Sequence, residues 1–442
     1  MRAGWGETDA VKPLNRRQFF GAAAVGAAAL SALRLRAADA AAAPAARKMK
    51  LGLIGCGWYG LVDVKAALKA GGVEVVALCD VDSEHLATSA SEIEQLQGSR
   101  PQTFKLYAEM LAMTGLEAVI IATPPHWHAL QFIAAMERGL DVYCEKPLAY
   151  DVCEGRAMVA AAAKSGRIVQ IGFQRRQSAA FHAVRQFIAD GNLGRIVSVD
   201  AQIHFTAGTV SATPQPPPAS LDWELWCGPG PVVPYSPQVG HKNWRLERTT
   251  GHGHFVDWGI HLIDATRYIL GETAPRSISA AGGIYQLKGK ITTPDTLNVH
   301  FEFERCPVSW RHRIWGAEEF TPETNNGITF FGEKGTVFVT DNKWIHIPRG
   351  KGAGRRASEV KTDAGLLHMA EFLNAVRERR QPGCTIADAF LSTTAVKLAM
   401  IAYDTGARIT WDAKAGQIVG HPEAAKLLKR AYRAPWQHPD RT

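Results

Sequence analysis

The sequence contains no apolar run long enough to cross a membrane and no concentration of basic residues. A membrane-spanning helix needs about 20 consecutive apolar residues, and no stretch of the 442-residue chain reaches that length. The net charge of +8 is spread along the chain, whereas nucleic-acid binding requires basic residues gathered on one face. The short basic stretches at 351–356 and 377–380 are typical of solvated surfaces. The sequence therefore argues against a membrane span and against a nucleic-acid partner.

Cysteine does not occur in patterns that form disulfides or metal sites. The seven cysteines never form a Cys-x-x-Cys unit, and an odd number argues against a complete disulfide framework. We interpret them as small buried side chains. Hydrophobic residues make up 46% of the chain and charged residues 21%, which is the balance of a soluble globular protein. The length is sufficient for two domains.

What the sequence does contain begins with a segment that resembles an export signal. Arg16 and Arg17 precede an alanine-rich apolar run that extends to Leu33, and a small-residue site, Ala38-Asp39-Ala40, follows. This arrangement is typical of a signal peptide, and the paired arginines resemble the twin-arginine signal. We therefore expect residues 1–46 to be a signal peptide and linker read by the twin-arginine export machinery. The protein would then be periplasmic or otherwise exported, and it would cross the membrane already folded.

A glycine-rich loop follows the first strong strand signal. The apolar run Met49–Ile54 predicts a buried parallel strand, and a helical pattern follows the loop Gly55-Cys56-Gly57-Trp58-Tyr59-Gly60. Gly55 permits a tight turn, Gly57 lets the backbone approach a pyrophosphate, and Gly60 allows the helix to pack close to the strand. The N–H groups at the helix start would face the phosphates. The simpler alternative is a glycine-rich turn in an unrelated βαβ unit.

An acidic residue ends the next expected strand, Val75–Cys79. Asp80 lies 20 residues beyond Gly60, at the position where a carboxylate accepts hydrogen bonds from the adenosine ribose hydroxyls. A 2′-phosphate at this position would meet Asp80 and Asp82, with no arginine or lysine beside them in the sequence. The sequence therefore favours NAD over NADP as the cofactor.

Strands and helices continue to alternate, with short connections, as far as Ile171. Further strands are expected at 117–122, 141–144 and 168–171, with helices at 127–138 and 152–163. This alternation predicts a doubly wound parallel sheet, a Rossmann dinucleotide-binding domain, which we assign to residues 47–175. Ligands of such sheets bind beyond the carboxyl ends of the strands. Two unusual segments follow such ends, namely Thr123-Pro124-Pro125-His126-Trp127-His128 and Glu145-Lys146-Pro147.

The second half of the sequence has the pattern of an α+β domain, which we assign to residues 176–442. Consecutive alternating strands predict a large, mostly antiparallel open sheet. The expected strands are 196–205, 277–285, 296–303, 307–314, 327–331 and 336–340, and the expected late helices are 368–380 and 387–403. An open sheet with an uncovered face is a natural surface for a homo-oligomer. The proline-rich loop 206–243 is too long for a simple connection, so we expect it to cover or line the cleft.

Several motifs occur together in an order that resembles one enzyme family. Besides the glycine loop, the Thr-Pro segment and Glu145-Lys146-Pro147, the chain contains Gly172-Phe173-Gln174 and Asp257-Trp258-Gly259-Ile260-His261. Together these motifs resemble the glucose–fructose oxidoreductase, inositol dehydrogenase and rhizopine-catabolism family, usually written Gfo/Idh/MocA, from Met49 to Trp436. Within that family the chain is similar to the twin-arginine-exported, tryptophan-rich branch.

The resemblance implies a role for each motif. Lys146 would hydrogen-bond the reacting hydroxyl near the nicotinamide, and its bond to Pro147 would be cis, as is frequent in the family. Asp257 and His261 would be the paired residues of the substrate domain, with His261 taking or giving the proton. The residues implied at the cofactor are Gly55, Gly57, Trp58, Tyr59, Gly60, Asp80, Thr123, Pro124, His128 and Glu145.

The same side chains suit hydride transfer by their chemical types. The nicotinamide performs the hydride transfer, while the protein positions the substrate and manages one proton. A base with a pKa near the working pH must reach the hydroxyl, which favours His261. Asp257 lies four residues earlier, so on an α-helix the two share a face and the carboxylate would orient the imidazole. Asp264 would lie on the same face, and Lys146 would stabilise a developing alkoxide.

Simpler interpretations of these residues stay open. An Asp-x-x-x-His pair on a helix is frequently a surface pair without a catalytic role. His252, His254, Asp257 and His261 also have the ligand types that zinc accepts, although no cysteine or distant ligand joins them, and we expect no metal. Since the family usually has a small residue where His252 lies, His252 is a candidate substrate contact.

Tryptophans indicate the class of substrate. Four of them fall within residues 215–259, namely Trp223, Trp226, Trp244 and Trp258. Tryptophan rings stack on the apolar faces of sugars, although they are also ordinary core and interface residues. Polar partners for hydroxyls or a carboxylate lie nearby in the sequence, namely Arg175, Arg176, Asn243 and Arg245. We therefore expect a small carbohydrate or polyol substrate.

Three functions fit these features. The first is oxidation of a hydroxyl of a sugar, polyol or glycoside by a tightly bound NAD(P), because an exported enzyme cannot draw on cytoplasmic NAD. The second is a redox-neutral, NAD-dependent glycoside hydrolase or lyase that uses transient oxidation, although family members of that kind frequently lack the lysine present here as Lys146. The third is a catalytically silent sugar- or nucleotide-binding protein, which the combination of Lys146, Asp257 and His261 disfavours.

Overall fold

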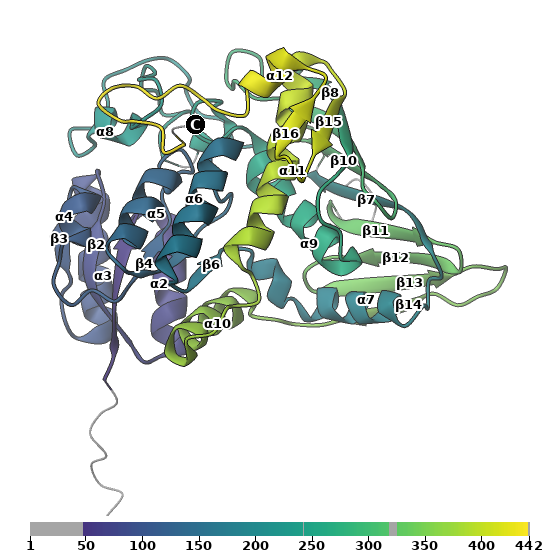
Figure 1. Ribbon diagram of the computed structural model, residues 1–442, viewed down its shortest axis with the longest axis horizontal. Coiled ribbons are helices and arrows are strands. Elements are labelled where there is room, and N and C mark those ends of the chain that lie inside the picture. The colour runs from purple at the N-terminus through teal and green to yellow at the C-terminus, as the bar shows by residue number, and fades with distance from the viewer. Residues whose placement is uncertain (1–46, 242, 318–324, 441–442) are drawn as a thin grey trace, which may run out of the picture. The chain divides into compact units, whose positions relative to one another are not determined.

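Two β-sheets lie side by side in the structure, a computed structural model that describes residues 47–241, 243–317 and 325–440 (Figure 1). Residues from Met49 onward form one compact unit. The expected signal segment, 1–46, lies outside the described residues.

The first sheet is the expected doubly wound parallel sheet. Its strand order is β3-β2-β1-β4-β5-β6, and every pairing is parallel. The strands are β1 (Met49–Ile54), β2 (Val73–Cys79), β3 (Gln102–Phe104), β4 (Ala118–Ile121), β5 (Asp141–Cys144) and β6 (Val169–Ile171). The chain leaves β1 toward β2 and returns on the other side of β1 at β4. The carboxyl ends of β1 and β4 therefore border the point where such folds bind ligands.

Helices cover both faces of this sheet, which explains why its strands are almost continuously apolar. Leu51 and Leu53 of β1 belong to the apolar cluster under α2, α3 and α10, whereas Ile54 faces the cluster that includes α5 and α6. The helices are α2 (Trp58–Ala70), α3 (Ser83–Gln97), α4 (Tyr107–Leu111), α5 (His128–Glu137) and α6 (Val152–Ser165). The sheet is thus buried on both sides and open to ligands only at its strand ends.

The second sheet has ten strands in the order β14-β13-β12-β11-β7-β10-β9-β8-β15-β16. Its pairings are antiparallel except for β7 with β10. Six strands agree with the prediction, namely β7 (Ile196–His204), β8 (Ser277–Gly283), β9 (Thr296–Glu302), β10 (Pro307–Arg313), β11 (Asn326–Gly332) and β12 (Gly335–Val339). Four edge strands were not predicted, namely β13 (Lys343–Pro348), β14 (Arg356–Glu359), β15 (Ile409–Asp412) and β16 (Gln417–Val419).

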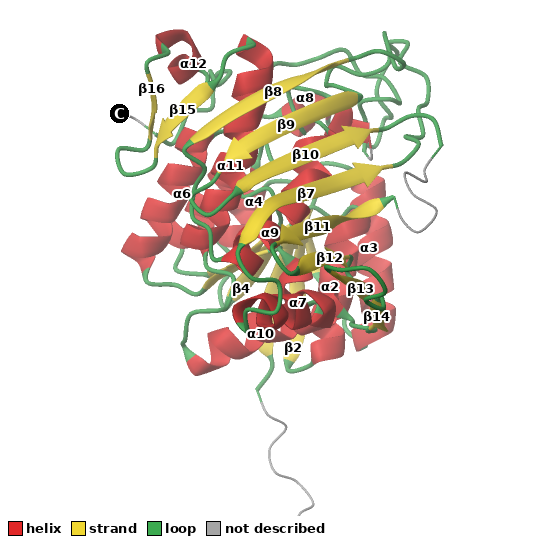
Figure 2. Ribbon diagram, turned by 90° about the vertical axis from the view of Figure 1, so that its right-hand side faces the viewer, coloured by secondary structure: helices red, strands yellow, loops and turns green. Residues whose placement is uncertain are grey.

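One face of the second sheet is covered and the other is open. Helices α7 (Ala179–Ala189), α9 (Ile260–Leu270) and α11 (Ile386–Thr405) contact the strands from one side. Leu297, Val299 and Phe301 of β9 are buried, whereas Asn298 and His300 between them are exposed. Figure 2 shows β7 to β10 facing the viewer with no helix over them.

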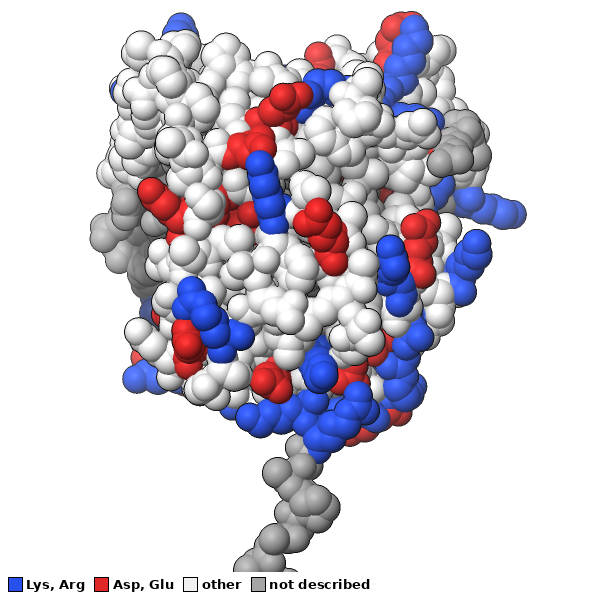
Figure 3. Space-filling model, turned by 90° about the vertical axis from the view of Figure 1, so that its left-hand side faces the viewer, with Lys and Arg blue, Asp and Glu red and all other residues white. Residues whose placement is uncertain are grey.

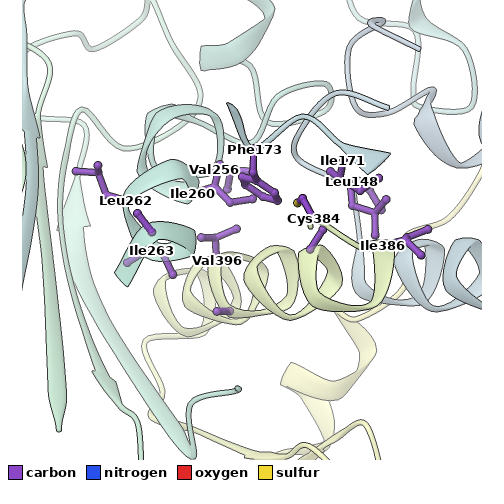
Figure 4. Packing of buried hydrophobic residues seen from close by; sticks show 14 of the residues in the cluster. Leu148, Ile171, Phe173, Val256, Ile260, Leu262, Ile263, Cys384, Ile386 and Val396 are labelled. Atoms are coloured by element: carbon purple, nitrogen blue, oxygen red, sulfur yellow. The ribbon is translucent and has the colours of Figure 1, made fainter. Parts of the chain in front are cut away.

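The two late helices join the halves of the molecule. Helix α10 (Ala364–Glu378) contacts α2, and α11 contacts α6, α9 and β8. Figure 4 shows Phe173 beside β6, Ile260 of α9 and Val396 of α11 within one apolar cluster. Burial of such a side chain contributes about 1.5–3 kcal/mol, so this shared core fixes the two sheets against each other.

Helix α11 is also the one helix in the described ranges that is long and apolar enough to cross a membrane by length and composition. Of its most apolar window, 67% is buried inside the protein. Contacts with helices and strands on several sides account for its apolar character as a core helix.

The burial of the cysteines and the distribution of surface charge agree with the interpretation of the sequence. All seven cysteines lie in the described part of the chain, where they are buried and unpaired. Figure 3 shows acidic and basic side chains mixed over most of the face near α3 and α4, with basic ones gathered at its lower edge.

Candidate active site

The glycine loop has the geometry of a pyrophosphate cradle. Gly55 has φ +95°, and a Cβ there would lie 2.8 Å from the backbone of Ala122 and Thr123. A Cβ on Gly60 would overlap the carbonyl oxygen of Gly55, whereas a Cβ on Gly57 would meet nothing within 4 Å. Gly57 precedes α2, and no side chain caps the helix. The loop therefore leaves open space beside uncapped helical N–H groups, where an anionic pyrophosphate fits.

Asp80 marks the adenosine end of a cavity of about 380 Å³. The cavity begins at Gly55, Gly57, Trp58 and Tyr59 and extends past the carboxyl end of β2. Asp80 accepts hydrogen bonds from the Cys56 N–H at 2.7 Å and the Asp82 N–H at 2.9 Å. Burial raises the pKa of Asp80, although these two N–H groups lower it. The carboxylate thus lies where ribose hydroxyls would bind.

Segments from the second half of the chain cover this cavity. Trp226 and His241 of the 206–243 loop line it, together with Trp436 near the C-terminus. Trp436 packs edge-on against Trp127, with 5.6 Å between ring centroids. Arg433 fastens this tail by donating to Glu224 and to the carbonyls of Gly228 and Gly230, and Figure 1 shows the yellow tail passing near α8 (Trp223–Cys227). The long loop therefore lines the cleft, as expected.

A second cavity of about 330 Å³ shares walls with the first. Trp58, Tyr59, Thr123, Trp244 and Arg245 line both. The second cavity adds three residues predicted as catalytic and three others predicted at the cofactor or substrate, namely Lys146, Asp257, His261, Glu145, Arg175 and Trp258. A dinucleotide in the first cavity would therefore end beside the predicted catalytic residues.

Lys146 follows the carboxyl end of β5 and is hydrogen-bonded to Asp257. Its Nζ lies 2.8 Å from Asp257 Oδ1 and 2.8 Å from the Asp257 carbonyl oxygen, and its bond to Pro147 is cis, as the resemblance implied. Arg245 Nε lies 2.8 Å from Asp257 Oδ2. Burial alone would raise the pKa of Asp257, but the charges of Lys146 and Arg245 outweigh it and lower that pKa. An ammonium has three N–H donors, so one remains for a ligand.

His261 does not pair with Asp257, which corrects the sequence prediction. Residues Phe255–Gly259 form a π-helical turn before α9, and the wider turn breaks the four-residue spacing on which the pairing depended. His261 is buried, and its Nδ1 has no hydrogen-bond partner among the described residues. Burial, followed by the charges of Lys146 and Arg175, holds the pKa of His261 well below its usual value. The imidazole is therefore neutral near pH 7, but it is a weaker base than an exposed histidine, whereas the sequence prediction assumed a pKa near the working pH.

Glu145 is buried and forms hydrogen bonds behind the same site. Its carboxylate accepts from Gln174 Nε2 at 2.6 Å and from the Lys146 backbone N–H at 3.2 Å. Burial raises the pKa of Glu145 to about 7, against the lowering effect of Lys146. A carboxyl group with this pKa titrates in the neutral range beside Lys146.

Three residues predicted to contact the substrate lie away from it. Arg176 is buried and bonds both oxygens of Asp264, at 2.8 and 2.6 Å, and Asp388 at 2.5 Å. Asp264 therefore belongs to a separate structural network and does not complete the His261 face. His252 stacks on Tyr150 with ring centroids 5.6 Å apart, and neither it nor the half-buried Asn243 lines either cavity.

His128 stabilises the backbone near the proposed cofactor site through two hydrogen bonds. Its Nδ1 lies 2.9 Å from the Pro147 carbonyl oxygen and its Nε2 lies 2.7 Å from that of Thr123. The ring thus joins the two loops that follow β4 and β5, and it does not line the cavity wall. Pro124 and Thr123 do line the first cavity.

The alternative metal set does not converge. His252 faces Tyr150, His254 packs against His312, and Asp257 is paired with Lys146. Within the described ranges, these residues form no group with ligand atoms close enough to share an ion.

The tryptophans divide into core and cavity residues. Trp223 and Trp226 stack with ring centroids 4.5 Å apart in a small buried cluster, so packing explains Trp223, whereas Trp226 also lines the first cavity. Trp244 and Trp258 line the second cavity, and the guanidinium of Arg175 lies 5.7 Å from the Trp258 ring. Two aromatic walls and Arg175 are therefore available to a polyhydroxylated ligand.

Sequence reasoning missed several cavity residues. Lys105 follows β3 and lines the first cavity, where its Nζ lies 2.6 Å from Asp222. A lysine is therefore present near Asp80, contrary to the prediction from neighbouring sequence, although Asp222 pairs with it. Asp341 and Asn342 line the second cavity between β12 and β13. Lys105 follows β3, which was too short to be recognised, whereas Asp341 and Asn342 lie in the turn between β12 and β13, and β13 was not predicted.

The fold and site define a class of enzyme. Residues 49–173 match the sequence family described as "Oxidoreductase family, NAD-binding Rossmann fold". Residues 230–338 match the "GFO/IDH/MocA C-terminal domain", and residues 345–438 match "Oxidoreductase family, C-terminal alpha/beta domain". The protein is an NAD(P)-dependent oxidoreductase. The chain belongs to the Gfo/Idh/MocA family.

Individual relatives have related activities. The chain is 26% identical to 1,5-anhydro-D-fructose reductase of Ensifer adhaerens over 76% of its own length and 91% of that protein. It is 27% identical to the rhizopine catabolism protein MocA of Rhizobium meliloti over 80% and 94% of the two chains. The structure of levoglucosan dehydrogenase with NADH and levoglucosan shares the fold, with a TM-score of 0.65 and 19% identity over 82% and 99% of the chains.

Proposed function

We propose that the protein oxidises a hydroxyl group of a sugar, polyol or glycoside with NAD as the hydride acceptor. The observation that supports this proposal most directly is the common wall of the two cavities, because Lys146 and His261 line the second cavity and we propose the first as the dinucleotide site. Relatives named for sugar and polyol substrates support the substrate class. Trp244, Trp258 and Arg175 supply the side chains that such a substrate needs.

The residues of the second cavity divide the proton chemistry between them. NAD, when bound, accepts a hydride from the carbon that carries the hydroxyl. The third N–H of Lys146 donates to the hydroxyl oxygen and stabilises the charge that develops there. The neutral imidazole of His261 accepts the hydroxyl proton. Asp257 holds the lysine in place.

We propose NAD in preference to NADP, bound tightly. Asp80 would bind the ribose hydroxyls, and its charge disfavours a 2′-phosphate. Lys105 cannot readily offset that charge because Asp222 already pairs with it. Trp226 and Trp436 line the first cavity, and contacts of this kind from the loop and the tail support tight binding. Nucleotide released by denaturing the purified protein, separated chromatographically, would identify the cofactor.

The main rival is redox-neutral cleavage of a glycoside. The proposed export and the proposed tight binding of NAD both favour it. An enzyme that returns the hydride to its substrate within each cycle does not need to exchange its cofactor. Products formed from aryl glycosides separate the two functions. A keto-sugar derivative with the aglycone still attached supports net oxidation, whereas free aglycone with an unoxidised sugar contradicts it. A protein that binds sugar and NAD but forms neither product would be a silent binding protein.

We propose that residues 1–46 direct export by the twin-arginine route. Arg16 and Arg17 ahead of a weakly apolar run support this proposal. Replacing both arginines by lysine should retain the protein in the cytoplasm, as measured by cell fractionation and immunoblotting. Unchanged periplasmic recovery of the double variant would contradict it.

We also propose a homo-oligomer through the open face of the second sheet. That face carries alternating exposed side chains such as Asn298 and His300 and no covering helix (Figure 2). Light scattering on the purified protein, with Asn298→Arg as the interface variant, tests it. A monomer in both proteins would exclude the proposal.

A further inference from the structure

Three side chains of metal-ligand type converge at the adenosine end of the first cavity. Asp82, His85 and His241 each offer one ligand atom, and these atoms lie within 4.8 Å of one another. Asp82 and His85 belong to the start of α3, whereas His241 comes from the 206–243 loop. All three line the cavity. None takes part in the proposed proton chemistry.

The one close separation in this group suits two ligands of a small cation better than a direct hydrogen bond. His241 Nε2 lies 3.3 Å from Asp82 Oδ2, which is longer than most N–H···O hydrogen bonds. Two ligands on one tetrahedral zinc ion, each about 2.0–2.2 Å from it, are separated by roughly 3.4 Å. The rings of His85 and His241 lie close together, with 4.3 Å between centroids.

Asp82 is held in the orientation that a ligand needs. Its Oδ1 accepts from the backbone N–H groups of Glu84 at 2.9 Å and His85 at 3.3 Å, which leaves Oδ2 directed at His241. Hydrogen bonds of this kind orient a carboxylate ligand. The Asp80 carboxylate, next to Asp82, adds negative charge that favours a cation.

A second cluster of metal-ligand type in the same protein is already neutralised by an arginine side chain. Asp151, Glu154 and His438 also converge, but Glu154 accepts from Arg430 Nε at 2.8 Å and from the Tyr432 hydroxyl at 2.8 Å. A protein cation already occupies that cluster. At Asp82, by contrast, the charge faces two imidazoles.

We propose that Asp82, His85 and His241 bind one divalent transition-metal ion of the zinc type, with a fourth position open to the cavity. Two imidazoles and one carboxylate are a ligand set that zinc accepts, and a site with three protein ligands keeps one position for water or a ligand. Such an ion fastens the 206–243 loop to α3, across the adenosine end of the dinucleotide site.

The test is zinc binding by the full-length, chelator-treated protein without added nucleotide. Isothermal titration with zinc chloride should give one site per chain. His85→Gln and His241→Gln should each weaken that site by at least about tenfold, since even residues beside metal ligands change affinity by 10–100-fold. The matched control is His300→Gln, because His300 is an exposed histidine paired only with Glu302 on β9.

Each outcome of the zinc titration either supports or overturns the proposal. One site in the wild type and in His300→Gln, weakened in both other variants, supports the proposal. Absence of a stoichiometric site in the wild type overturns it without reference to any variant. Equal affinity in His85→Gln, with an unchanged melting temperature showing that the variant is folded, also overturns it. NAD binding is measured separately, so failure of the metal site leaves the oxidoreductase proposal intact.

Discussion

At the scale of single residues, the arrangement around Asp257 determines what Lys146 can do. Asp257 contacts two cations, Lys146 and Arg245, and is itself 3% exposed. Two of the three lysine N–H donors are thereby used, and Lys146 lines the second cavity, which leaves one donor for a ligand there. The proposed chemistry therefore depends on how Asp257 holds this lysine.

Replacing Lys146 by methionine keeps the volume and removes the donor. We expect turnover to fall by about 10²–10³-fold, the usual cost of losing one stabilising donor, while the dissociation constant of NAD changes little. Steady-state kinetics and nucleotide fluorescence titration measure the two quantities. Lys65→Met on the exposed side of α2 is the control. Equal activity of Lys146→Met and the control would remove Lys146 from the mechanism.

Asp257→Asn should affect stability as well as activity. The substitution leaves Lys146 and Arg245 without their shared counter-charge, and breaking such a pair costs about 3 kcal/mol. Because the pKa of Asp257 is lowered in the folded state, its stabilising effect is complete above the unfolded value of about 3.9. That effect is lost as the pH falls through the lower folded value. Denaturant unfolding at pH 7 and at pH 3 should show the stability difference shrinking at the lower pH.

His261 predicts a particular pH dependence. Since its pKa is held well below the usual value, the base form persists as the pH falls below about 6.5, the ordinary histidine value. The part of the acid limb of kcat/KM that His261→Asn abolishes should therefore lie below that value. Burial raises the pKa of Glu145 to about 7, so a limb that survives in His261→Asn is assigned to Glu145 and tested with Glu145→Gln. A His261-dependent limb above pH 6.5 would contradict this assignment.

The sequence predicted that these residues lie in one cleft, but it did not predict which of them hydrogen-bond to one another. Lys146, Asp257 and His261 follow motifs at a strand end and a helix start, and general rules for such folds place them in one cleft. Their partners depend on distant neighbours. Arg176 is bound by Asp264 and Asp388, which no local pattern reveals, so its substrate role was predicted wrongly.

At the scale of elements, the connection between β1 and α2 makes the sharpest prediction. A Cβ on Gly57 meets no atom within 4 Å, whereas one on Gly60 overlaps the Gly55 carbonyl. Gly57→Ala should therefore leave the melting temperature unchanged but weaken NAD binding, because the methyl group occupies the approach of the pyrophosphate. Gly60→Ala should lower both.

Thermal unfolding and NAD titration on the two variants distinguish these effects. If both variants bind NAD as the wild type does, the loop is a structural turn and not a phosphate cradle. A melting temperature lowered equally in both would show that packing, and not ligand approach, explains Gly57.

The elements that were predicted correctly carry a strong hydrophobic period. Strands β1 and β9 show continuous and alternating burial respectively, as expected of a covered and a half-open sheet. Strand β14 is exposed at all four residues, so it has no hydrophobic alternation to recognise. The π-helical turn at Phe255–Gly259 likewise depends on packing and cannot be read from residue spacing.

At the scale of the whole molecule, the two sheets act as one unit because α10 and α11 return to the first half. The apolar cluster runs from β4 and β5 through α11 to β9. The dinucleotide cavity is correspondingly built from both halves of the chain, because its lining includes Trp127 from the first half and Trp436 from the second, and the two rings contact each other. The division into domains at residue 175 stays a prediction about folding units, whereas the site itself belongs to both halves.

If the proposed function is correct, a nicotinamide nucleotide bound in the first cavity is reduced by a sugar or polyol bound in the second. The fluorescence of the protein-bound nicotinamide, recorded after sugars and polyols are added to the NAD-loaded protein, measures this directly. We expect at least one such compound to reduce the bound nucleotide in the wild type and to fail to do so in Lys146→Met. A protein that binds no nicotinamide nucleotide, or a Lys146→Met variant that reduces it equally fast, would exclude this function.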